Sequence, residues 1–441
     1  MEVVFERCAG LDVHKQNVVA CVRVSGRKGN GVVKTFNTMT HGLQALRDWL
    51  VAEQVTHVAM ESTGVYWKPV WNILEDHFEL LLCNAKQVKQ VPGRKTDVND
   101  CEWLAKLLQH GLLSPSFVPD RGLRDMRDLT RYRVKLTGQH TAEVNRIQAV
   151  LEDANLKLGD VASDIMGASG RAILDALVAG ETDPAKLASM AKKSLKKKIP
   201  ELKLALDGKL TAHHRFILGM HLEATRSIEA AIAKLDARIA EITGPPPSPP
   251  GDRPDAMPGS EEPSSASAEE GASARGEPPL SMAEALRLVC TIPGISLRLA
   301  QDILAEIGPD MSQFHSSGAL ASWAGMCPGN NESAGKKRSG RTKKGSSWLK
   351  RSLGIAGSCC GRLKDSFLAT RHRRVAKRSG KLRAVVASGH ALLRVIYAIL
   401  TLRQEYSDRG ADYFDRINTT RQIRYHQRRL RELQAMSAPA A

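Results

Sequence analysis

The sequence predicts an α/β domain followed by a mostly helical remainder. Over residues 1–115, short apolar runs rich in β-branched residues alternate with amphipathic helical patterns. From 116 to 243 the periodicity is helical, and it becomes helical again from 281 to 402. A segment rich in Pro, Ser and Glu, 244–280, lies between these helical stretches, and a basic tail fills 403–441. These five ranges are the predicted domains.

The first range holds five predicted strands and three predicted helices. The strands are 3–11, 18–24, 32–36, 55–60 and 79–83, and the helices are 42–53, 66–77 and 97–111. The first three strands follow one another closely, which indicates antiparallel pairing, whereas helices separate the later strands. This order favours a mixed sheet with helices on its faces.

Four carboxylates stand at the ends of predicted elements in this domain. Asp12 and Glu61 each end an apolar run, and Asp97 and Asp100 begin a helical pattern on one helix face. Taken singly, such acids are usually turn or helix-dipole residues. Together, converging carboxylates need a hard cation, and Mg²⁺ or Mn²⁺ suits oxygen ligands and substrate phosphates. The order of the four acids resembles the ribonuclease H-like fold of RuvC-type nucleases.

Two long helical patterns, 123–156 and 216–242, predict a coiled-coil connector. The second pattern has a predicted seam at alternating spacings of four and three, formed by Ile228, Ile232, Leu235, Ile239 and Ile242. The two helices could pair with each other or across a dimer. Between them, residues 192–203 form a basic stretch with a weak helical pattern.

Residues 244–279 have a composition that cannot bury a core. They contain 10 of the 20 prolines of the chain, and 7 acids against 2 arginines. Met257 is the only large apolar residue among them. This composition predicts a disordered linker.

The net charge of +17 is concentrated at the C-terminal end. Residues 330–441 hold 26 Lys and Arg against 7 Asp and Glu, a net of +19. Such an excess indicates a polyanionic partner, although a basic tail without a specific partner is the alternative. The segment 288–295 with the helix 300–307 resembles a helix-hairpin-helix element that grips phosphates, and an ordinary Pro-Gly turn fits equally well.

The Gly-rich segment 325–338 is not a phosphate-binding P-loop. Five residues rather than four separate Gly329 from Gly335, and Lys337 stands where Ser or Thr is required. A serine in such a loop is normally a turn residue. Ser333, however, abuts a cationic run that could stabilise a phosphodiester as a hydroxyl attacks it. The predicted nucleic-acid contacts are Lys336, Lys337, Arg338, Arg341, Lys343 and Lys344.

The eight cysteines form no C-x-x-C pair and mostly occupy apolar surroundings, so we expect reduced core residues and no structural zinc site. The N-terminus lacks a signal-peptide pattern, and no uninterrupted apolar run reaches ~18 residues. We therefore expect a cytoplasmic, nucleoid-associated protein with no membrane partner.

Several motifs, in order, resemble the IS110/IS116/IS902 transposase family. They are Gly10-Leu11-Asp12-Val13-His14-Lys15, Glu61-Ser62-Thr63-Gly64-Val65-Tyr66-Trp67, Lys95-Thr96-Asp97 with Asp100 and Trp103-Leu104-Ala105, Ile292-Pro293-Gly294-Ile295, and Cys327-Pro328-Gly329 through Ser333. The resemblance covers residues 10–353. It differs at Ser333-Ala334, where many members have Ser-Gly, and in the Pro-rich segment, which is similar to an insertion.

This resemblance implies a RuvC-like domain whose metal ligands are Asp12, Glu61, Asp97 and Asp100, a coiled-coil connector, and a transposase domain with Ser333 as nucleophile. It implies a DNA transposase/recombinase of a bacterial insertion element that uses Mg²⁺ or Mn²⁺ and forms a phosphoserine intermediate. An element-encoded guide RNA and a homo-dimer or tetramer are further implications. The alternatives are a RuvC-like junction nuclease that uses water, and a non-catalytic basic nucleic-acid-binding protein.

Overall fold

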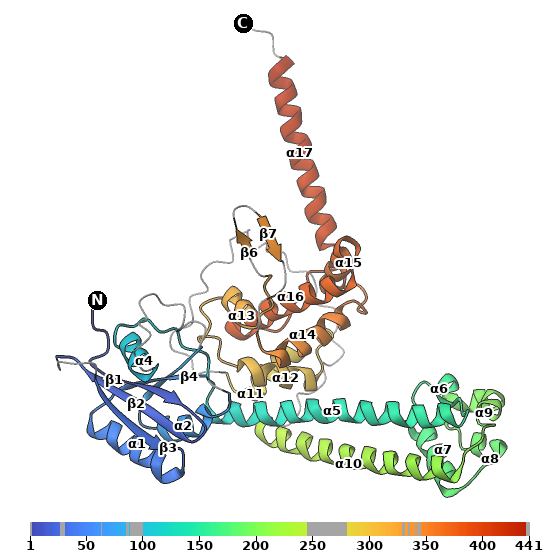
Figure 1. Ribbon diagram of the computed structural model, residues 1–441. Coiled ribbons are helices and arrows are strands. Elements are labelled where there is room, and N and C mark those ends of the chain that lie inside the picture. Colours follow the sequence, from blue (N-terminus) through green and yellow to red (C-terminus); the bar gives the residue numbers. More distant parts are fainter. Residues whose placement is uncertain are drawn as a thin grey trace. The chain divides into compact units, whose positions relative to one another are not determined.

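The computed structural model describes residues 2–26, 31–62, 64–84, 88, 100–244, 280–328, 331–333, 336–339, 342 and 345–437. The chain divides into two compact units, Met1–Pro119 and Asp120–Ala441 (Figure 1). The predicted linker, apart from its two end residues, lies outside the described residues.

The first unit is built on a five-stranded mixed sheet in the order β3-β2-β1-β4-β5. Its strands are β1 (Arg7–Val13), β2 (Asn17–Val24), β3 (Val32–Asn37), β4 (His57–Glu61) and β5 (Glu79–Cys83). The first three pair antiparallel, whereas β4 runs parallel to β1 and β5 parallel to β4. The predicted mixed α/β domain is therefore confirmed.

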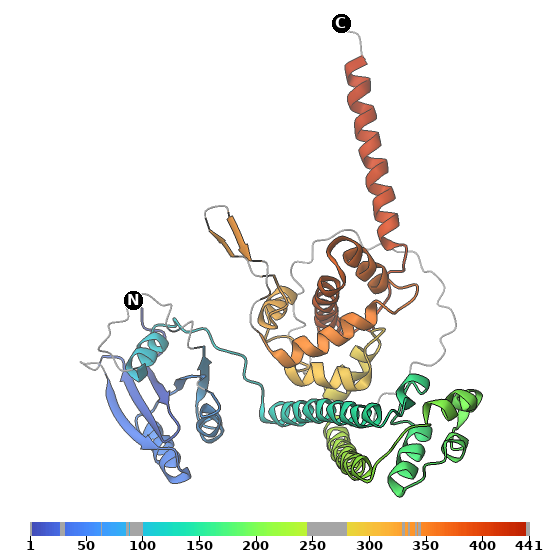
Figure 2. The same ribbon diagram turned by 45° about the vertical axis from the view of Figure 1, so that its right-hand side comes forward.

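Helices cover both faces of this sheet (Figures 1 and 2). The helices α1 (Thr40–Ala52) and α2 (Trp67–Leu74) pack on one face and α4 (Asp100–Gln109) on the other. Successive side chains of a strand point to opposite faces. Accordingly, Leu11 of β1 joins the core under α1 and α2, while Cys8 joins the core under α4.

The connector of the second unit is an antiparallel pair of long helices, α5 (Arg121–Asp153) and α10 (Ala212–Thr243). Two contacts show that the helices run in opposite directions. His140 of α5 contacts Glu229 of α10 at 2.9 Å, whereas Arg133, which precedes His140, contacts Asp236, which follows Glu229, at 3.0 Å. In the single chain the two helices therefore pair with each other, which is one of the two arrangements that the sequence left open.

The predicted seam of this pair was only partly right. Of its five members Ile239 alone is buried, and Ile242 is 37% exposed. The residues of α10 that are buried are Leu218, Leu222, Thr225, Ile239 and Thr243. Apolar spacing misplaced the seam because polar residues occupy part of it, as the pairing of Asp236 with the buried Arg133 shows.

A small helical subdomain at the far end of the connector was not predicted as a unit, although the weak helical pattern over 192–203 corresponds to part of it. It consists of α6 (Leu158–Val161), α7 (Ala168–Ala179), α8 (Pro184–Ser189), the 3₁₀ helix η1 (Lys193–Lys198) and α9 (Ile199–Ala205). These short helices share one hydrophobic core with the ends of α5 and α10, including Ile147, Ile173 and Leu218. Individually they are too short for a clear periodic pattern, which explains the omission.

The remaining helices form a bundle, as predicted for a mostly helical C-terminal region. They are α11 (Met282–Cys290), α12 (Leu297–Ile307), α13 (Ser317–Trp323), α14 (Ser347–Cys360), α15 (Phe367–Ser379), α16 (Lys381–Leu402) and α17 (Tyr413–Ser437). By length and composition, α16 alone among the described helices could cross a membrane. Its buried residues, such as Leu392 and Ile396, suit the core helix of a bundle equally well.

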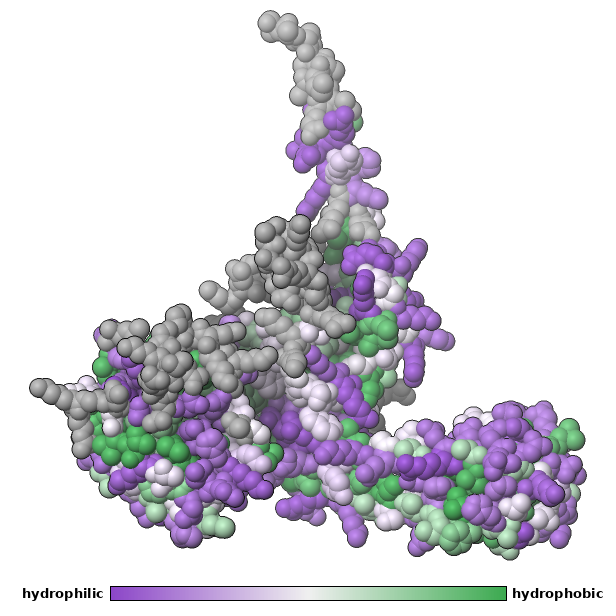
Figure 3. Space-filling view, viewed as in Figure 1, coloured by the Kyte–Doolittle hydropathy of each residue, from purple (hydrophilic) through white to green (hydrophobic). Residues whose placement is uncertain are grey.

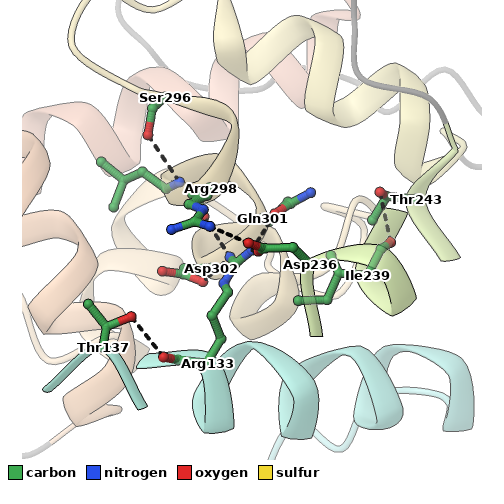
Figure 4. A network of polar contacts seen from close by, with 10 residues as sticks. Arg133, Thr137, Asp236, Ile239, Thr243, Ser296, Arg298, Gln301 and Asp302 are labelled. Carbon is green, nitrogen blue, oxygen red and sulfur yellow. Dashed lines mark hydrogen bonds and ion pairs between the residues drawn. The ribbon is translucent and has the colours of Figure 1, made fainter. Parts of the chain in front are cut away.

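A buried polar network ties the connector to the bundle (Figure 4). Arg133, which is 3% exposed, donates to Asp236 at 3.0 Å, to Gln301 at 2.8 Å and to Asp302 at 2.7 Å. Nearby, Arg131 makes a two-pronged contact with the buried Glu306 at 2.7 and 2.9 Å. Helix α12 is thereby fixed to α5 by paired charges, which are strongly orienting when buried.

The cysteines are free, as expected, and five of the eight are buried. Burial raises the pKa of the Cys21 thiol to about 12 and that of the Cys8 thiol to about 11. These thiols are therefore protonated at neutral pH and act as small apolar core residues.

Candidate active site

Strand register places Asp12 and Glu61 at the same edge of the sheet. Leu11 of β1 pairs with Met60 of β4 in parallel register, so the next residues, Asp12 and Glu61, stand side by side at the strand ends. Both also belong to the set of alternate residues that faces α4, because Leu11 and Met60 face the opposite core. Two predicted site residues from distant parts of the sequence are thus brought together.

Helix α4 lies directly over this part of β1. A side chain on Gly10 would come within 2.3 Å of the Cys101 carbonyl oxygen and 2.4 Å of the Ala105 nitrogen. Asp100 is the first residue of α4, next to Cys101. Burial raises the pKa of the Cys101 thiol to about 11, and the negative charge of Asp12 adds to this shift. The start of α4 therefore lies near the carboxylate of Asp12.

The fourth predicted ligand, Asp97, lies outside the described residues. Within those residues, no group of three or more His, Cys, Asp or Glu side chains is arranged to hold a metal ion. The predicted ligands that approach the sheet edge, Asp12 and Glu61, are carboxylates, which is the ligand type that Mg²⁺ and Mn²⁺ prefer. The chemistry of this donor set fits a hard divalent cation.

His14 is a neighbour of this edge whose role sequence reasoning missed. Its Nε2 lies 3.1 Å from Oδ2 of Asp12, and the Asp12 side chain is 24% exposed. The motif Asp12-Val13-His14 already contained the pair, but β1 ends at Val13, so strand alternation does not predict the direction of the His14 side chain. The contact orients the Asp12 carboxylate.

Ser333 lies at the tip of a β-hairpin. It ends β6 (Asn331–Ser333) and pairs with Lys336, which begins β7 (Lys336–Ser339). A bridge between Pro328 and Thr342 lies closer to the base of the hairpin. This region was predicted as a loop among helices; the strands escaped prediction because their polar residues show no apolar alternation.

The basic run is carried by this hairpin and the segment after it. Lys336, Lys337 and Arg338 belong to β7, and the side chains of the hairpin lie outside the described part of the structure. Arg341, Lys343 and Lys344 are likewise outside it. The backbone register nevertheless sets a lysine directly opposite Ser333.

The hairpin is connected to the network described above through Ser346. The Oγ atom of Ser346 donates to Glu306 at 3.0 Å and accepts from the Leu349 amide at 3.3 Å as the N-cap of α14. The chain that leaves the basic run is therefore anchored at the buried Glu306.

The segment 288–295 joins the two helices α11 and α12 by a tight turn, which fits both the predicted helix-hairpin-helix element and an ordinary Pro-Gly turn. Gly294 in that turn has φ +88°, and a side chain there would approach Cys359 of α14 at 3.2 Å. Ile292 and Ile295 are buried. Its phosphate-binding role remains a prediction.

A pocket of about 610 Å³ lies between α5 and α10, where Asp125, Tyr132 and Ile242 are among its lining residues. It contains none of the predicted site residues. We therefore do not connect it with the acids or with Ser333.

Comparison with protein families gives two matches. Residues 9–155 match the model of DEDD transposases of IS110 elements, described as a transposase. Residues 286–372 match the model described as transposase IS116/IS110/IS902 family. Among curated proteins, none matches the chain.

The two matches contain the four acids and Ser333, respectively. They define the class of protein as a transposase, an enzyme that binds, cuts and rejoins DNA. The chain belongs to the IS116/IS110/IS902 transposase family of insertion sequences.

Proposed function

We propose that this transposase cuts and rejoins DNA by serine attack on a phosphodiester, assisted by a metal ion held by the four acids. The observation that carries the proposal is the parallel register of β1 and β4, which sets Asp12 beside Glu61 under α4. The sheet order β3-β2-β1-β4-β5 further supports a RuvC-like fold for the first unit.

The proposed metal ligands are Asp12, Glu61, Asp97 and Asp100. Mg²⁺ or Mn²⁺ bound there would neutralise phosphate charge and ease loss of the proton from the attacking hydroxyl. His14 would orient Asp12 through the 3.1 Å contact. The acids supply oxygen ligands for the metal ion. The nearby thiols of Cys83 and Cys101 are buried, so they would not compete as sulfur ligands.

In the proposed step the Oγ atom of Ser333 bonds to phosphorus, and the bond from phosphorus to the leaving oxygen breaks. The serine proton leaves, and the leaving oxygen takes up a proton. Lys336 and the following cations would hold the phosphate oxygens as charge develops on them. A second exchange with a DNA hydroxyl then releases Ser333 and rejoins the DNA.

The family membership supports two partners besides DNA. We propose that an element-encoded guide RNA pairs with donor and target DNA, so that the protein reads duplex shape and backbone. We also propose assembly as a dimer or tetramer, since the acids and Ser333 belong to different units of the chain.

A water-using nuclease is the second candidate. It is favoured by the fact that the first unit alone carries all four acids, as metal-assisted hydrolysis would require. A water-using nuclease would not need Ser333, so substitutions at this residue distinguish it from serine attack.

The test compares wild type, Ser333→Ala and Ser333→Cys on labelled DNA ends with denaturing gels. We expect the wild-type protein to give a DNA-shifted protein band. The Ser333→Ala variant should bind DNA normally but form no adduct, and it should neither transfer nor nick strands. Nicking by Ser333→Ala at the wild-type rate would establish the water-using nuclease. Cleavage by wild type with no adduct, even on a suicide substrate, would refute serine attack.

A further inference from the structure

The last helix, α17, has a composition unlike the rest of the bundle. Residues 416–431 contain six arginines and no Asp or Glu. Neither family match reaches this helix, since the second ends at residue 372. The basic run 336–344, which precedes α14, is separated from α17 in the sequence.

Aromatic stacking fixes the start of α17 to α15. Phe367 of α15 stacks on Phe414 with centroids 5.2 Å apart and meets Tyr413 edge-on at 5.0 Å. The Arg374 guanidinium lies 4.9 Å from the Phe414 ring centre. The first turn of the helix is therefore anchored, and the basic segment starts from a defined position on the bundle.

Beyond this anchor the helix leaves the bundle (Figures 1 and 2). Every described side chain from Thr419 to Arg431 is exposed, and the described part of α17 is mainly hydrophilic (Figure 3). A helix without tertiary packing is only marginally stable in water. A binding partner for this surface would stabilise it.

Three arginines form a stripe along the exposed helix. Arg424, Arg428 and Arg431 are spaced four and three residues apart, which places them on one face. All are arginines rather than lysines, and the guanidinium group matches phosphate oxygens with two parallel hydrogen bonds. We propose that α17 is a second DNA-binding element that enters the major groove of duplex DNA and sets this stripe against the phosphates along one edge of the groove.

The shape of the element favours DNA over double-stranded RNA. The major groove of B-DNA, about 12 Å wide, admits an α-helix, whereas the major groove of A-form RNA is too narrow for side chains to read. A membrane surface is disfavoured because the large apolar or aromatic residues among the described side chains from Thr419 to Arg431 are only Ile423, Tyr425 and Leu430, with no Trp or Phe. The inference rests on the family's action on DNA, and it is independent of the serine chemistry.

The test measures binding of the full-length protein to a short duplex without element sequence, in EDTA, over a range of salt concentrations. The variant is Arg424→Gln/Arg428→Gln/Arg431→Gln. Its control, Lys203→Gln/Lys209→Gln/Lys234→Gln, removes the same charge from exposed positions in α9, in the loop after it and in α10. EDTA removes catalysis, so a failure of the proposed chemistry cannot affect the result.

We expect the arginine variant to bind DNA more weakly, with a log–log salt slope reduced by about 0.9 for each phosphate that the variant no longer neutralises. The lysine control should retain the wild-type slope, and an RNA duplex should bind both variants equally. Unchanged DNA affinity of the arginine variant would overturn the proposal. A larger loss for the RNA duplex, or a loss confined to anionic phospholipid vesicles, would assign α17 to those partners instead.

Discussion

Asp12 is positioned by its neighbours more than by its own chemistry. Antiparallel pairing with Val19 and parallel pairing of the preceding Leu11 with Met60 fix its backbone, and His14 holds its carboxylate at 3.1 Å. The side chain still keeps 24% of its surface exposed. A carboxylate with a fixed backbone, an orienting partner and an accessible surface is suited to metal binding.

We predict that Asp12→Asn lowers strand transfer in Mg²⁺ by about 10²–10³-fold or more, on the scale of losing a major electrostatic contribution. The amide keeps the size of the side chain, so the melting temperature and DNA affinity should hold. Strand transfer and thermal unfolding, measured on the same preparation, check this. Near-normal transfer would remove Asp12 from the metal site.

Arg133 contributes to the stability of the fold through the buried groups that it contacts. Replacing it with Met leaves Asp302 and Gln301 in a buried place without their main donor, and we expect a loss of about 3–5 kcal/mol. Arg146→Met, at a position 57% exposed, should cost little by comparison. Denaturant unfolding of both variants measures the difference, and equal losses would contradict a structural role for the network.

The stability that Arg133→Met loses should depend on pH in a direction set by Asp302. Burial already raises the pKa of Asp302 above its ordinary value of 3.8, and Arg133 opposes that shift. Without Arg133 the pKa rises further, so the folded state binds a proton more strongly than the unfolded state. The deficit of Arg133→Met should therefore shrink as the pH falls through the raised pKa toward 3.8.

At the scale of elements, the sheet could be predicted because its strands are apolar and bounded by turns. The predicted 55–60 and 79–83 correspond to β4 (His57–Glu61) and β5 (Glu79–Cys83). The sequence order of the acids suggested that Asp12 and Glu61 lie close together, but it could not establish their register. The parallel register of two strands depends on tertiary packing. The hairpin of Ser333 and the α6–α9 subdomain escaped because short polar or short helical segments carry little periodicity.

Gly10 illustrates a close approach between elements that the sequence alone does not disclose. Its backbone touches α4 so closely that a methyl group would lie 2.3 Å from the Cys101 carbonyl. Gly10→Ala should push α4 from β1, cost about 1–3 kcal/mol, and also weaken strand transfer by moving Asp100.

The matched control is Gly138→Ala on α5, where an added methyl group meets nothing within 4 Å. Alanine there should stabilise the helix by about 0.5–1 kcal/mol. Thermal unfolding of the two variants separates a packing effect from a general glycine effect. A Gly10→Ala protein as stable as wild type would show that α4 can move freely over β1.

On the scale of the whole molecule, acidic and basic functions lie in different parts of the chain. The four acids precede residue 101, whereas residues 330–441 carry the net charge of +19. The stretch between the two folded parts of the second unit, 245–279, lies outside the described residues, so its predicted role as a linker rests on composition. Length and charge can be derived from the sequence, whereas the assembly that we propose to unite the acids with Ser333 cannot.

Deleting residues 252–276 should change the melting temperature little, because composition predicts no packed surface in this segment. Limited proteolysis of the intact chain should cut there first. A protease-resistant segment, or a deletion variant with a clearly lower melting temperature, would show that this segment is part of the fold.

The basic run on the hairpin and the segment after it should act on all DNA sequences alike. Charges that meet phosphates release condensed counterions, so the log–log salt slope falls by about 0.9 for each phosphate left without a cationic partner. We predict that neutralising the run reduces affinity for element ends and for unrelated duplexes by the same factor. The six substitutions to Gln are at Lys336, Lys337, Arg338, Arg341, Lys343 and Lys344.

Binding in EDTA at several salt concentrations measures this prediction without interference from cleavage. Adding the α17 substitutions to the same protein should lower the slope further, since the two basic elements lie at separate places in the sequence and would contact separate phosphates. Salt-independent binding would contradict a backbone contact altogether. Loss confined to element ends would instead mean that the hairpin reads bases, a role that belongs to groove contacts rather than to phosphate contacts.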